Sequence, residues 1–448
     1  MNQTTIFDMM YPKYKITKPI RLIEMFSGYG SQALALKYLG VSFEHWRTCE
    51  WAIKSIQAYK DIHCENNDID YSYLIPKEEI IDILYELGIS SNYNDPMEKQ
   101  QIQRLNEKQI RTIYNNICAT NNLVNIQQVK GKDLEIIDTD KYEYIMTYSF
   151  PCQDLSLAGK GQGMSDTSTR SGLLWEVERI LTECKELGTM PQVLLMENVP
   201  QVHSLDNMPD FHKWQVRLEE LGYKSYWQDL IATDYGIPQT RNRCFMISIL
   251  GDYSYTFPKP IPLKLKLKDM LEDNVDEKYY IKNGTLRCFF NQKENGFPRK
   301  ERFLQALELT NKKQLAGTLT ALQGGKATDN HILVKNTENY IEWYEKGKLD
   351  MDCRAWKEEK IIGALMTTMK KNKILKTDMA IRNLTPRECG RLQGVKDSDI
   401  TKLLSNQSDS SAYHCFGDAI TVPVLCAIFG ELLDIDYKKL IERWNYNE

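Results

Sequence analysis

The stretch Pro19-Ile-Arg-Leu-Ile-Glu-Met-Phe-Ser-Gly-Tyr-Gly-Ser-Gln-Ala-Leu-Ala-Leu-Lys-Tyr-Leu39 passes from an apolar run through a glycine turn into a helical pattern. It predicts a strand to Phe26, a turn over 27–31 and a helix over 32–39. This order opens a nucleotide-type βαβ unit, in which the glycines let backbone N–H groups approach a ligand at the helix amino end. A GxG pair is equally common in a purely structural turn. The choice between a ligand-binding turn and a structural turn therefore depends on the rest of the chain.

Three further predicted strands end in residues that carry chemistry. Residues 43–49 lead to Glu50-Trp51, residues 142–148 to Phe150-Pro-Cys-Gln153, and the wholly apolar residues 191–196 to Glu197-Asn-Val199. Ligands of open α/β sheets bind at the carboxyl ends of the strands. We therefore expect an α/β fold with these groups at one edge, although a lone cysteine is more often a buried core residue than a nucleophile.

Composition sets limits on the function. The 448 residues carry a net charge of −4 and have a pI near 6.0, which argues against a uniformly basic nucleic-acid binder but not against a local basic cleft. The 11 cysteines include no CxxC pair, and no amino-terminal signal is visible, so we expect reduced thiols in the cytoplasm. We find no apolar run of about 20 residues and expect no membrane span.

The remaining chain divides into regions that differ in composition and in hydrophobic periodicity. Residues 60–128 predict a mostly helical insertion, with helices over 78–87 and 96–117, and a short strand is expected over 126–129. The catalytic domain would occupy residues 1–269 with this insertion, a small basic domain residues 270–378, and a carboxyl-terminal segment residues 379–448. Thr385, Pro386 and Glu388 predict a capped helix start, and Arg241 and Arg243 form a fork suited to an anion or a base edge.

Ten short segments, in their order along the chain, resemble the motifs of DNA (cytosine-5) methyltransferases of the bacterial and phage type. They are Phe26-Ser-Gly-Tyr-Gly, Glu50-Trp51, Asp133-Leu134, Phe150-Pro-Cys-Gln, Arg170-Ser-Gly-Leu-Leu, Glu197-Asn-Val, Gln239-Thr-Arg-Asn-Arg243, Arg382-Asn-Leu-Thr-Pro-Arg-Glu, Arg391-Leu-Gln-Gly394 and Gly417-Asp-Ala-Ile-Thr-Val-Pro-Val424. The resemblance implies a Rossmann-like class I methyltransferase domain that uses S-adenosylmethionine, with an inserted target-recognition domain and no metal.

The resemblance also implies catalytic roles. Cys152 would attack C6 of cytosine, so that C5 can accept a methyl group. Glu197 would bind N3, Arg243 would hold the base edge and the glutamate, and Arg241 would orient the substrate.

Cofactor contacts follow from the same resemblance. The residues expected at S-adenosylmethionine are Phe26, Gly28, Tyr29, Gly30, Glu50, Trp51, Asp133, Leu134, Pro151, Asp418, Ala419 and Ile420. Ser31 and Asp418 depart from the family pattern, which often has glycine at the first position and usually asparagine at the second.

The implied partner is double-stranded DNA with the target cytosine flipped out of the helix. The residues expected at the DNA or in the closing loop are Gln153, Ser156, Arg170, Gln239, Thr318 and Thr320, with the basic domain reading the major groove. A monomer is expected, with a cognate restriction endonuclease as a functional partner. The target sequence is not readable.

Other interpretations remain open. One is a tRNA cytosine-5 methyltransferase of the same superfamily, which has little in place of the basic domain. Another is a non-catalytic DNA-binding homologue, against which the intact catalytic set argues. A dinucleotide oxidoreductase is disfavoured, because the full GxGxxG spacing is missing.

Overall fold

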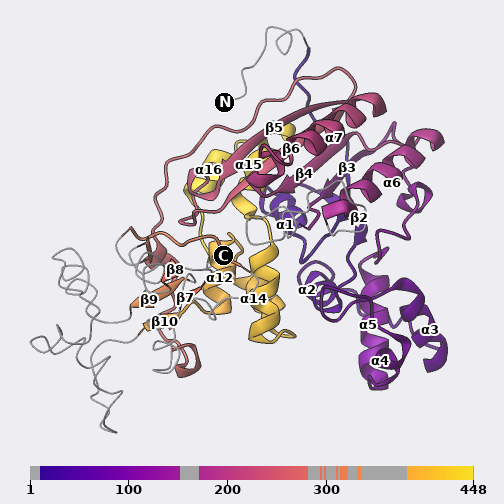
Figure 1. Cartoon of the computed structure of the whole chain (residues 1–448), viewed down its shortest axis with the longest axis horizontal. Coiled ribbons are helices and arrows are strands. Elements are labelled where there is room, and N and C mark those ends of the chain that lie inside the picture. The colour runs from indigo at the N-terminus through magenta and orange to yellow at the C-terminus, as the bar shows by residue number, and fades with distance from the viewer. Residues whose placement is uncertain are drawn as a thin grey trace, which may run out of the picture.

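The computed structural model describes residues 11–151, 171–280 and 381–446, together with the short segments 293–294, 297–298, 309–310, 313–320 and 330–333. A six-stranded sheet forms the centre of the described chain, in the order β2-β1-β3-β4-β6-β5 (Figure 1). Its strands are β1 (Ile20–Met25), β2 (Phe43–Cys49), β3 (Glu143–Tyr148), β4 (Val193–Asn198), β5 (Tyr223–Ile231) and β6 (Asn242–Leu250).

The sheet is parallel over most of its width. β1 pairs in parallel with β2 and β3, and β3 with β4, whereas β6 runs antiparallel to both β4 and β5. The carboxyl ends of β1 to β4 therefore meet at one edge. The predicted α/β fold is confirmed, with a sheet that is parallel over four of its six strands.

Helices cover both faces of the sheet because side chains alternate along each strand. Ile20 and Leu22 of β1 pack into the core that contains α1 (Ser31–Tyr38) and α15 (Val422–Leu433), and Ile23 and Met25 pack into the core of the opposite face. That second core contains α6 (Leu174–Leu187) and α7 (Met208–Leu221). Both faces of the sheet are therefore covered by helices, so a ligand can reach the strands only at their ends.

The region that follows α2 (Ile53–His63) forms a helical lobe with its own apolar core (Figure 1). It comprises α3 (Lys77–Leu87), α4 (Lys99–Gln103) and α5 (Glu107–Ala119). The predicted helix over 78–87 is confirmed, but the one predicted over 96–117 is divided. Asn106 caps α5 by accepting a hydrogen bond from the Gln109 N–H at 2.9 Å, so a new helix starts there.

The strand predicted over 126–129 is wrong. These residues follow left-handed backbone at Asn121 (φ 48°) and Val124 (φ 62°) and form turns. A single parallel bridge instead joins Thr48 of β2 to Asn122.

The carboxyl-terminal helices are α12 (Pro386–Leu392), α13 (Asp397–Leu404), α14 (Asp409–Asp418), α15 and α16 (Tyr437–Glu442). The predicted helix start is confirmed, since Thr385 accepts from the Glu388 N–H and Glu388 from the Thr385 N–H. α15 packs on α1, and Lys37 of α1 contacts Asp399 of α13 at 2.7 Å. The last segment thus lies against the first β–α unit.

One stretch, Asp409–Leu433, is long and apolar enough by composition to be a candidate membrane span, which the sequence had not suggested. It includes α14 and α15, and 78% of its apolar window is buried inside the fold. We therefore assign it to the protein core.

Only part of the predicted recognition domain is described. It includes the 3₁₀ turn Glu277–Tyr279, the small antiparallel pair of β7 (Lys293–Glu294) with β8 (Phe297–Pro298), and β9 (His331–Leu333). β9 pairs antiparallel with β10 (Ile381–Asn383), which belongs to the predicted carboxyl-terminal segment. The division into domains stays a prediction.

Candidate active site

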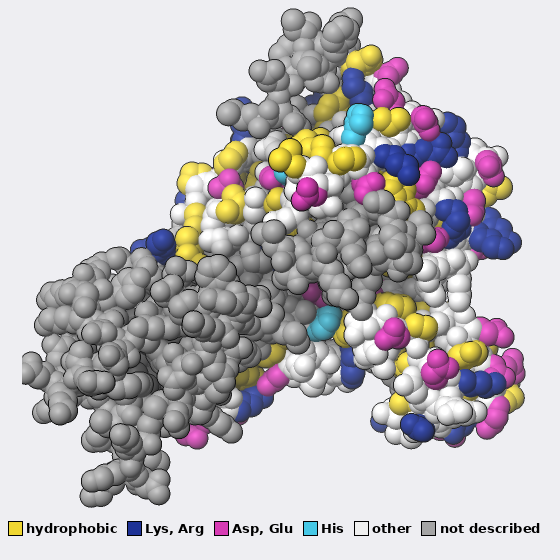
Figure 2. Space-filling view, viewed as in Figure 1, with side chains coloured by type: hydrophobic (Ala, Val, Ile, Leu, Met, Phe, Trp, Pro, Cys, Tyr) yellow, Lys and Arg dark blue, Asp and Glu magenta, His cyan; other side chains and the backbone are white. Residues whose placement is uncertain are grey.

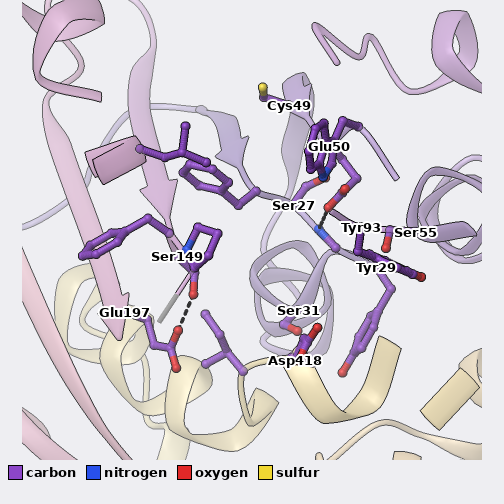
Figure 3. A pocket seen from close by; sticks show the side chains of 18 of the residues that line it. Ser27, Tyr29, Ser31, Cys49, Glu50, Ser55, Tyr93, Ser149, Glu197 and Asp418 are labelled. Atoms are coloured by element: carbon purple, nitrogen blue, oxygen red, sulfur yellow. Dashed lines mark hydrogen bonds between the residues drawn. The ribbon is translucent and has the colours of Figure 1, made fainter. Parts of the chain in front are cut away.

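A cavity of about 470 Å³ lies at the carboxyl ends of β1 to β4 (Figure 3). Its walls come from the turns after these strands, from the start of β6, from the end of α14 and from the helical lobe. A cavity of this size is typical of small-molecule sites, and its place at strand ends is where α/β sheets bind ligands.

The glycine turn after β1 forms one wall. Gly28 (φ +54°) and Gly30 (φ +81°) both have left-handed backbone, as does Phe26 (φ 60°). A Cβ on Gly28 would meet no atom within 4 Å, whereas one on Gly30 would lie 2.5 Å from His63 Nε2. Gly28 therefore leaves open space for a ligand, while Gly30 allows the turn to pack on α2.

Glu50 is held beside this turn by backbone groups. Its Oε2 accepts the Gly28 N–H at 3.0 Å (Figure 3) and its Oε1 accepts the Ala52 N–H at 2.8 Å. The Asn122 side chain in turn bonds the Glu50 backbone N–H and C=O at 3.0 and 2.9 Å. Burial raises the pKa of Glu50, and hydrogen bonds from backbone N–H groups oppose this effect. The result is a fixed carboxylate in the cavity wall with lone pairs left for ligand hydroxyls.

The other end of the cavity holds a polar cluster at the ends of β3, β4 and β6. Glu197 is 4% exposed, and Arg243 Nε lies 3.1 Å from its Oε1. The hydroxyl of Ser149 donates to Glu197 Oε2 (Figure 3). Asn198 donates to the Phe150 carbonyl at 3.0 Å, which joins the end of β4 to the segment that enters Pro151. The carboxyl group is thus oriented by two partners and faces the cavity.

Arg241 lines the same cavity and is 3% exposed. Its Nη1 donates to the carbonyls of Leu319 and Gly417 at 3.2 and 3.1 Å. Arg241 therefore joins the 313–320 segment to the end of α14 at the cavity.

Asp418, Ala419 and Ile420, which were expected at the cofactor, form the far wall of the cavity. Pro151, Trp51, Phe26 and Tyr29 also line the cavity. The structure thus brings together residues that the sequence assigned separately to catalysis and to the cofactor.

Other lining residues were not predicted. Tyr93, Asn94 and Pro96 reach the cavity from the helical lobe, and Asn125 and Ile126 reach it from the segment after the lobe. The Asn94-Asp95-Pro96 turn signal is readable in the sequence, but nothing in it points to a cavity.

Three cofactor assignments are not supported by this geometry: those of Gly30, Asp133 and Leu134. The Cβ position of Gly30 faces His63 of α2 and not the cavity. Asp133 caps the 3₁₀ turn Gly131–Leu134 by accepting the Lys130 N–H at 2.8 Å, and Leu134 is buried in the core against α6. Neither is among the residues that line the cavity, where Asn125 and Ile126 are found instead.

The DNA-contact assignment of Gln239 is likewise not supported. Its side chain is fully buried, donating to the Leu392 carbonyl at 2.7 Å and accepting from the Leu319 N–H at 3.2 Å. Both ends of the amide are used inside the protein. Thr318 is half-buried, with its hydroxyl 3.4 Å from the Thr240 carbonyl, and Thr320 is exposed. Cys152, Gln153, Ser156 and Arg170 lie outside the described residues.

Among the described residues, His203, Asp229 and Cys244 place three possible metal ligands within 4.8 Å of one another. His203 Nε2 already bonds Asp229 Oδ1 at 2.9 Å, and burial raises the pKa of the Cys244 thiol. Burial thus disfavours the thiolate that a metal would need, and we assign no metal to this group.

Comparisons with known proteins agree on one family. The profile of the family described as C-5 cytosine-specific DNA methylase matches residues 96–434. Type II methyltransferase M2.ScrFI of Lactococcus lactis subsp. cremoris is 31% identical over 417 residues, covering 92% of this chain and 99% of its own. Orphan methyltransferase M.SssI of Spiroplasma monobiae is 36% identical over 273 residues, covering 60% of this chain and 68% of its own.

Solved structures share the fold. The Dnmt2 methyltransferase of S. pombe superposes with a TM-score of 0.55 at 15% identity, covering 92% of this chain and 98% of its own. The Entamoeba histolytica methyltransferase EhMeth gives a TM-score of 0.56 at 15% identity, covering 93% and 99%.

Proposed function

Because the chain belongs to the family of C-5 cytosine-specific DNA methylases, we propose that it transfers the methyl group of S-adenosylmethionine to C5 of a flipped-out cytosine in a specific double-stranded DNA sequence. The observation that supports this most directly is the single cavity shared by the Gly28–Glu50 wall and the Glu197–Arg243 pair. A methyl donor and a base could meet there.

The cofactor end of the cavity fits S-adenosylmethionine by its donor set. Glu50 has carboxylate oxygens for the ribose hydroxyls, and Trp51 offers a ring to stack against the adenine. The open space over Gly28 leaves room for the ligand to approach the backbone. When bound, the cofactor supplies an electrophilic methyl group on its sulfonium sulfur.

The proposed chemistry starts at Cys152, the residue after Pro151 in the sequence. Its thiolate attacks C6, the C5=C6 double bond opens and electron density moves towards C5 and N3. C5 would then take the methyl group as the carbon–sulfur bond of the sulfonium breaks, which leaves S-adenosylhomocysteine. Transfer of the C5 proton to water and departure of the Cys152 thiolate would restore the double bond.

Glu197 and Arg243 support that step. Glu197 would donate a proton or hydrogen bond to N3, where charge develops as the thiolate adds. Arg243 and Ser149 hold the carboxyl group in place before the base arrives. A preoriented group does not have to reorganise during the reaction.

A base inside a duplex cannot reach such a cavity, so the target must leave the helix, at a cost of a few kcal/mol. Residues of the predicted recognition domain would read the surrounding sequence. We propose a type II restriction–modification role with a cognate endonuclease as functional partner, because M2.ScrFI is named a type II methyltransferase. The relative M.SssI is named an orphan methyltransferase, so a role without an endonuclease is the alternative.

Methyl incorporation tests the proposal. The protein is incubated with tritiated S-adenosylmethionine and either plasmid DNA, single-stranded DNA or total tRNA, and the product bases are then analysed. We expect 5-methylcytosine in the plasmid at a defined sequence. Label in tRNA alone would favour the alternative substrate, and label in adenine or no label at all would overturn the proposal.

A Cys152→Ser variant tests the covalent step. It should bind plasmid DNA and S-adenosylhomocysteine like the wild type but transfer no methyl group. On DNA with 5-fluorocytosine at the target, the wild type should form an adduct stable to denaturation and the variant should not. Normal transfer by the variant would remove Cys152 from the mechanism.

A further inference from the structure

The helical lobe contributes directly to the cavity that the catalytic sheet builds. Its loop between α3 and α4 places Tyr93 and Asn94 in the cavity wall, beside the residues that follow β2. Tyr93 lies beside Ser55 and below Glu50 in the close view (Figure 3). The lobe is therefore more than an appendage of the fold.

Backbone hydrogen bonds fix this loop to the cofactor end of the sheet. The Ser90 N–H donates to the Trp51 carbonyl at 2.7 Å, and the Ile53 N–H donates to the Ser90 carbonyl at 2.9 Å. Within the loop, Asn92 Oδ1 accepts the N–H groups of Asn94 and Asp95 at 2.9 and 3.0 Å. The position of the loop thus follows that of Trp51.

Tyr93 has an unusual conformation at this place. Its φ of 63° is left-handed, which is costly for a residue with a Cβ and tends to persist where the surroundings demand it. Its ring stacks on that of His414, with centroids 3.7 Å apart and planes inclined by 9°. The left-handed backbone at Tyr93 is thus found together with a direct stack of its ring on His414.

His414 also contacts Asp418 in the far wall of the cavity. Its Nδ1 lies 3.0 Å from Asp418 Oδ2, one turn further along α14. Asp418 itself lines the cavity with Ala419 and Ile420. A chain of three side chains therefore links the helical lobe to the carboxyl-terminal wall.

The outer surface of the lobe does not have the charge pattern of a DNA-binding surface. In Figure 2, basic and acidic side chains are interspersed over the lobe that α3, α4 and α5 form in Figure 1. A mixed pattern of this kind is typical of a solvated surface and differs from the single-sign face that a DNA backbone selects.

We infer that the helical lobe completes the cofactor site, and that Tyr93 is a positioning residue that holds His414 and Asp418 against the bound cofactor. This inference rests on the proposed use of S-adenosylmethionine. Tyr93 would act on cofactor affinity, because it lies at the cofactor end of the cavity and away from the Glu197–Arg243 pair.

The test is a double-mutant cycle with S-adenosylhomocysteine as the probe, measured by isothermal titration calorimetry. Tyr93→Ala should weaken binding roughly three- to tenfold, the range of an aromatic stack. Tyr93→Phe keeps the ring and should restore affinity. Tyr93→Ala, His414→Ala and the double variant should show similar losses, since each removes the same contact.

Steady-state kinetics add a readout that a general loss of stability would not give. Tyr93→Ala should raise the KM for S-adenosylmethionine with kcat within about twofold, the signature of lost uniform binding. Tyr73→Ala, in the same lobe but 72% exposed, is the matched control and should change neither constant.

The outcomes distinguish a failure of the role assigned to Tyr93 from a failure of the proposed cofactor. If the wild type binds S-adenosylhomocysteine and Tyr93→Ala binds it equally well, the inference is overturned while the proposed function stands. Strictly additive losses in the cycle, or a Tyr93→Phe variant as weak as Tyr93→Ala, would also overturn it. A wild type that binds no S-adenosylhomocysteine would remove the proposed cofactor and the inference together.

Discussion

Arg243 Nε lies 3.1 Å from Glu197 Oε1, although the two residues belong to β6 and β4. β6 pairs antiparallel with β4, so the start of one strand meets the end of the other. Both side chains are largely shielded from water, with 15% and 5% exposed. An ion pair at such a place orients a carboxyl group more than it stabilises the fold, because desolvation offsets much of the attraction.

Glu197→Gln should lower kcat by roughly 10² to 10⁴, the contribution typical of a positioned acid or base. The amide keeps the shape of the side chain, so the affinity for S-adenosylhomocysteine should remain near that of the wild type. Single-turnover methyl transfer on a saturating DNA substrate measures the effect.

The matched control for this prediction is Glu143→Gln. Glu143 is also 4% exposed but lies at the amino end of β3, at the opposite edge of the sheet. Its variant should transfer methyl groups at a near wild-type rate. Equal activity of both variants would remove Glu197 from the reaction.

The two glycines of the first turn should respond differently to alanine. Gly30→Ala places a Cβ 2.5 Å from His63 Nε2 and 2.7 Å from Tyr59 Cε2, and should lower the free energy of unfolding by about 2 to 4 kcal/mol. Gly28→Ala meets open space and should cost only about 1 kcal/mol, from its left-handed backbone. Its main effect should be a higher KM for S-adenosylmethionine. Urea unfolding and kinetics on both variants check the contrast, and a reversed order would contradict it.

Arg382 and Glu388 form a buried ion pair where the chain returns from the predicted recognition domain. Two guanidinium nitrogens lie 2.7 and 2.8 Å from the two carboxylate oxygens, with the side chains 4% and 0% exposed. Arg382→Met would leave the carboxylate without its cation and should lower the free energy of unfolding by about 3 to 5 kcal/mol. Circular dichroism in urea gives the value.

A double variant separates charge from packing at this site. Arg382→Met with Glu388→Gln removes both charges. The amide oxygen can still accept from the Thr385 N–H, whereas the Glu272 N–H, which bonds the other carboxylate oxygen, loses its acceptor. The double variant should be more stable than Arg382→Met alone. A double variant that is less stable than the single one would show that the charge is not the cause.

The sequence predicted the first three strands closely, whereas β4 begins and ends two residues later than expected. β1 and β3 are buried along their whole length. The bounds expected for β2 agree with the structure, and those of β1 and β3 agree within one residue at each end. The prediction of a strand over residues 126–129 failed because the residue types there favour a strand, whereas the backbone turns just before them. Residues 126–129 have β-branched side chains at their ends, but left-handed backbone at Val124 turns the chain first.

Local pattern alone predicted the site where its residues lie at strand ends. Asp418, Ala419 and Ile420, at the end of α14, were expected there only from the family resemblance. Glu50, Glu197 and Arg243 share a cavity because the sheet edge assembles them. Tyr93 was missed because its place at the cavity depends on backbone hydrogen bonds that join Ser90 to Trp51 and Ile53, which no local sequence pattern signals. Gln239 looked like a DNA contact, but its partners Leu319 and Leu392 come from distant parts of the chain.

Glu24 of β1 gives a prediction about pH. The side chain is 1% exposed, and burial raises its pKa from 4.5 to about 7, although the Tyr59 hydroxyl and the Ala33 N–H donate to it. In the unfolded chain the carboxyl ionises first, near 4.5, so the folded state loses relative stability as pH rises from there to about 7. The stabilising contribution of the protonated form is therefore complete below pH 4.5 and lost above pH 7. The loss is about 3 kcal/mol at ~1.4 kcal/mol per pH unit.

Glu24→Gln removes that titration and keeps an oxygen that can accept from Tyr59. Relative to the wild type, the variant should gain stability between pH 5 and pH 8, by up to about 3 kcal/mol, and no further gain should follow above pH 8. Urea unfolding at several pH values measures the difference, with Glu79→Gln on the exposed side of α3 as the control. Because each variant is compared with the wild type at the same pH, other titrating groups such as Glu143 cancel. A constant difference between Glu24→Gln and the wild type over this range would show that Glu24 ionises at its ordinary pKa in the folded protein.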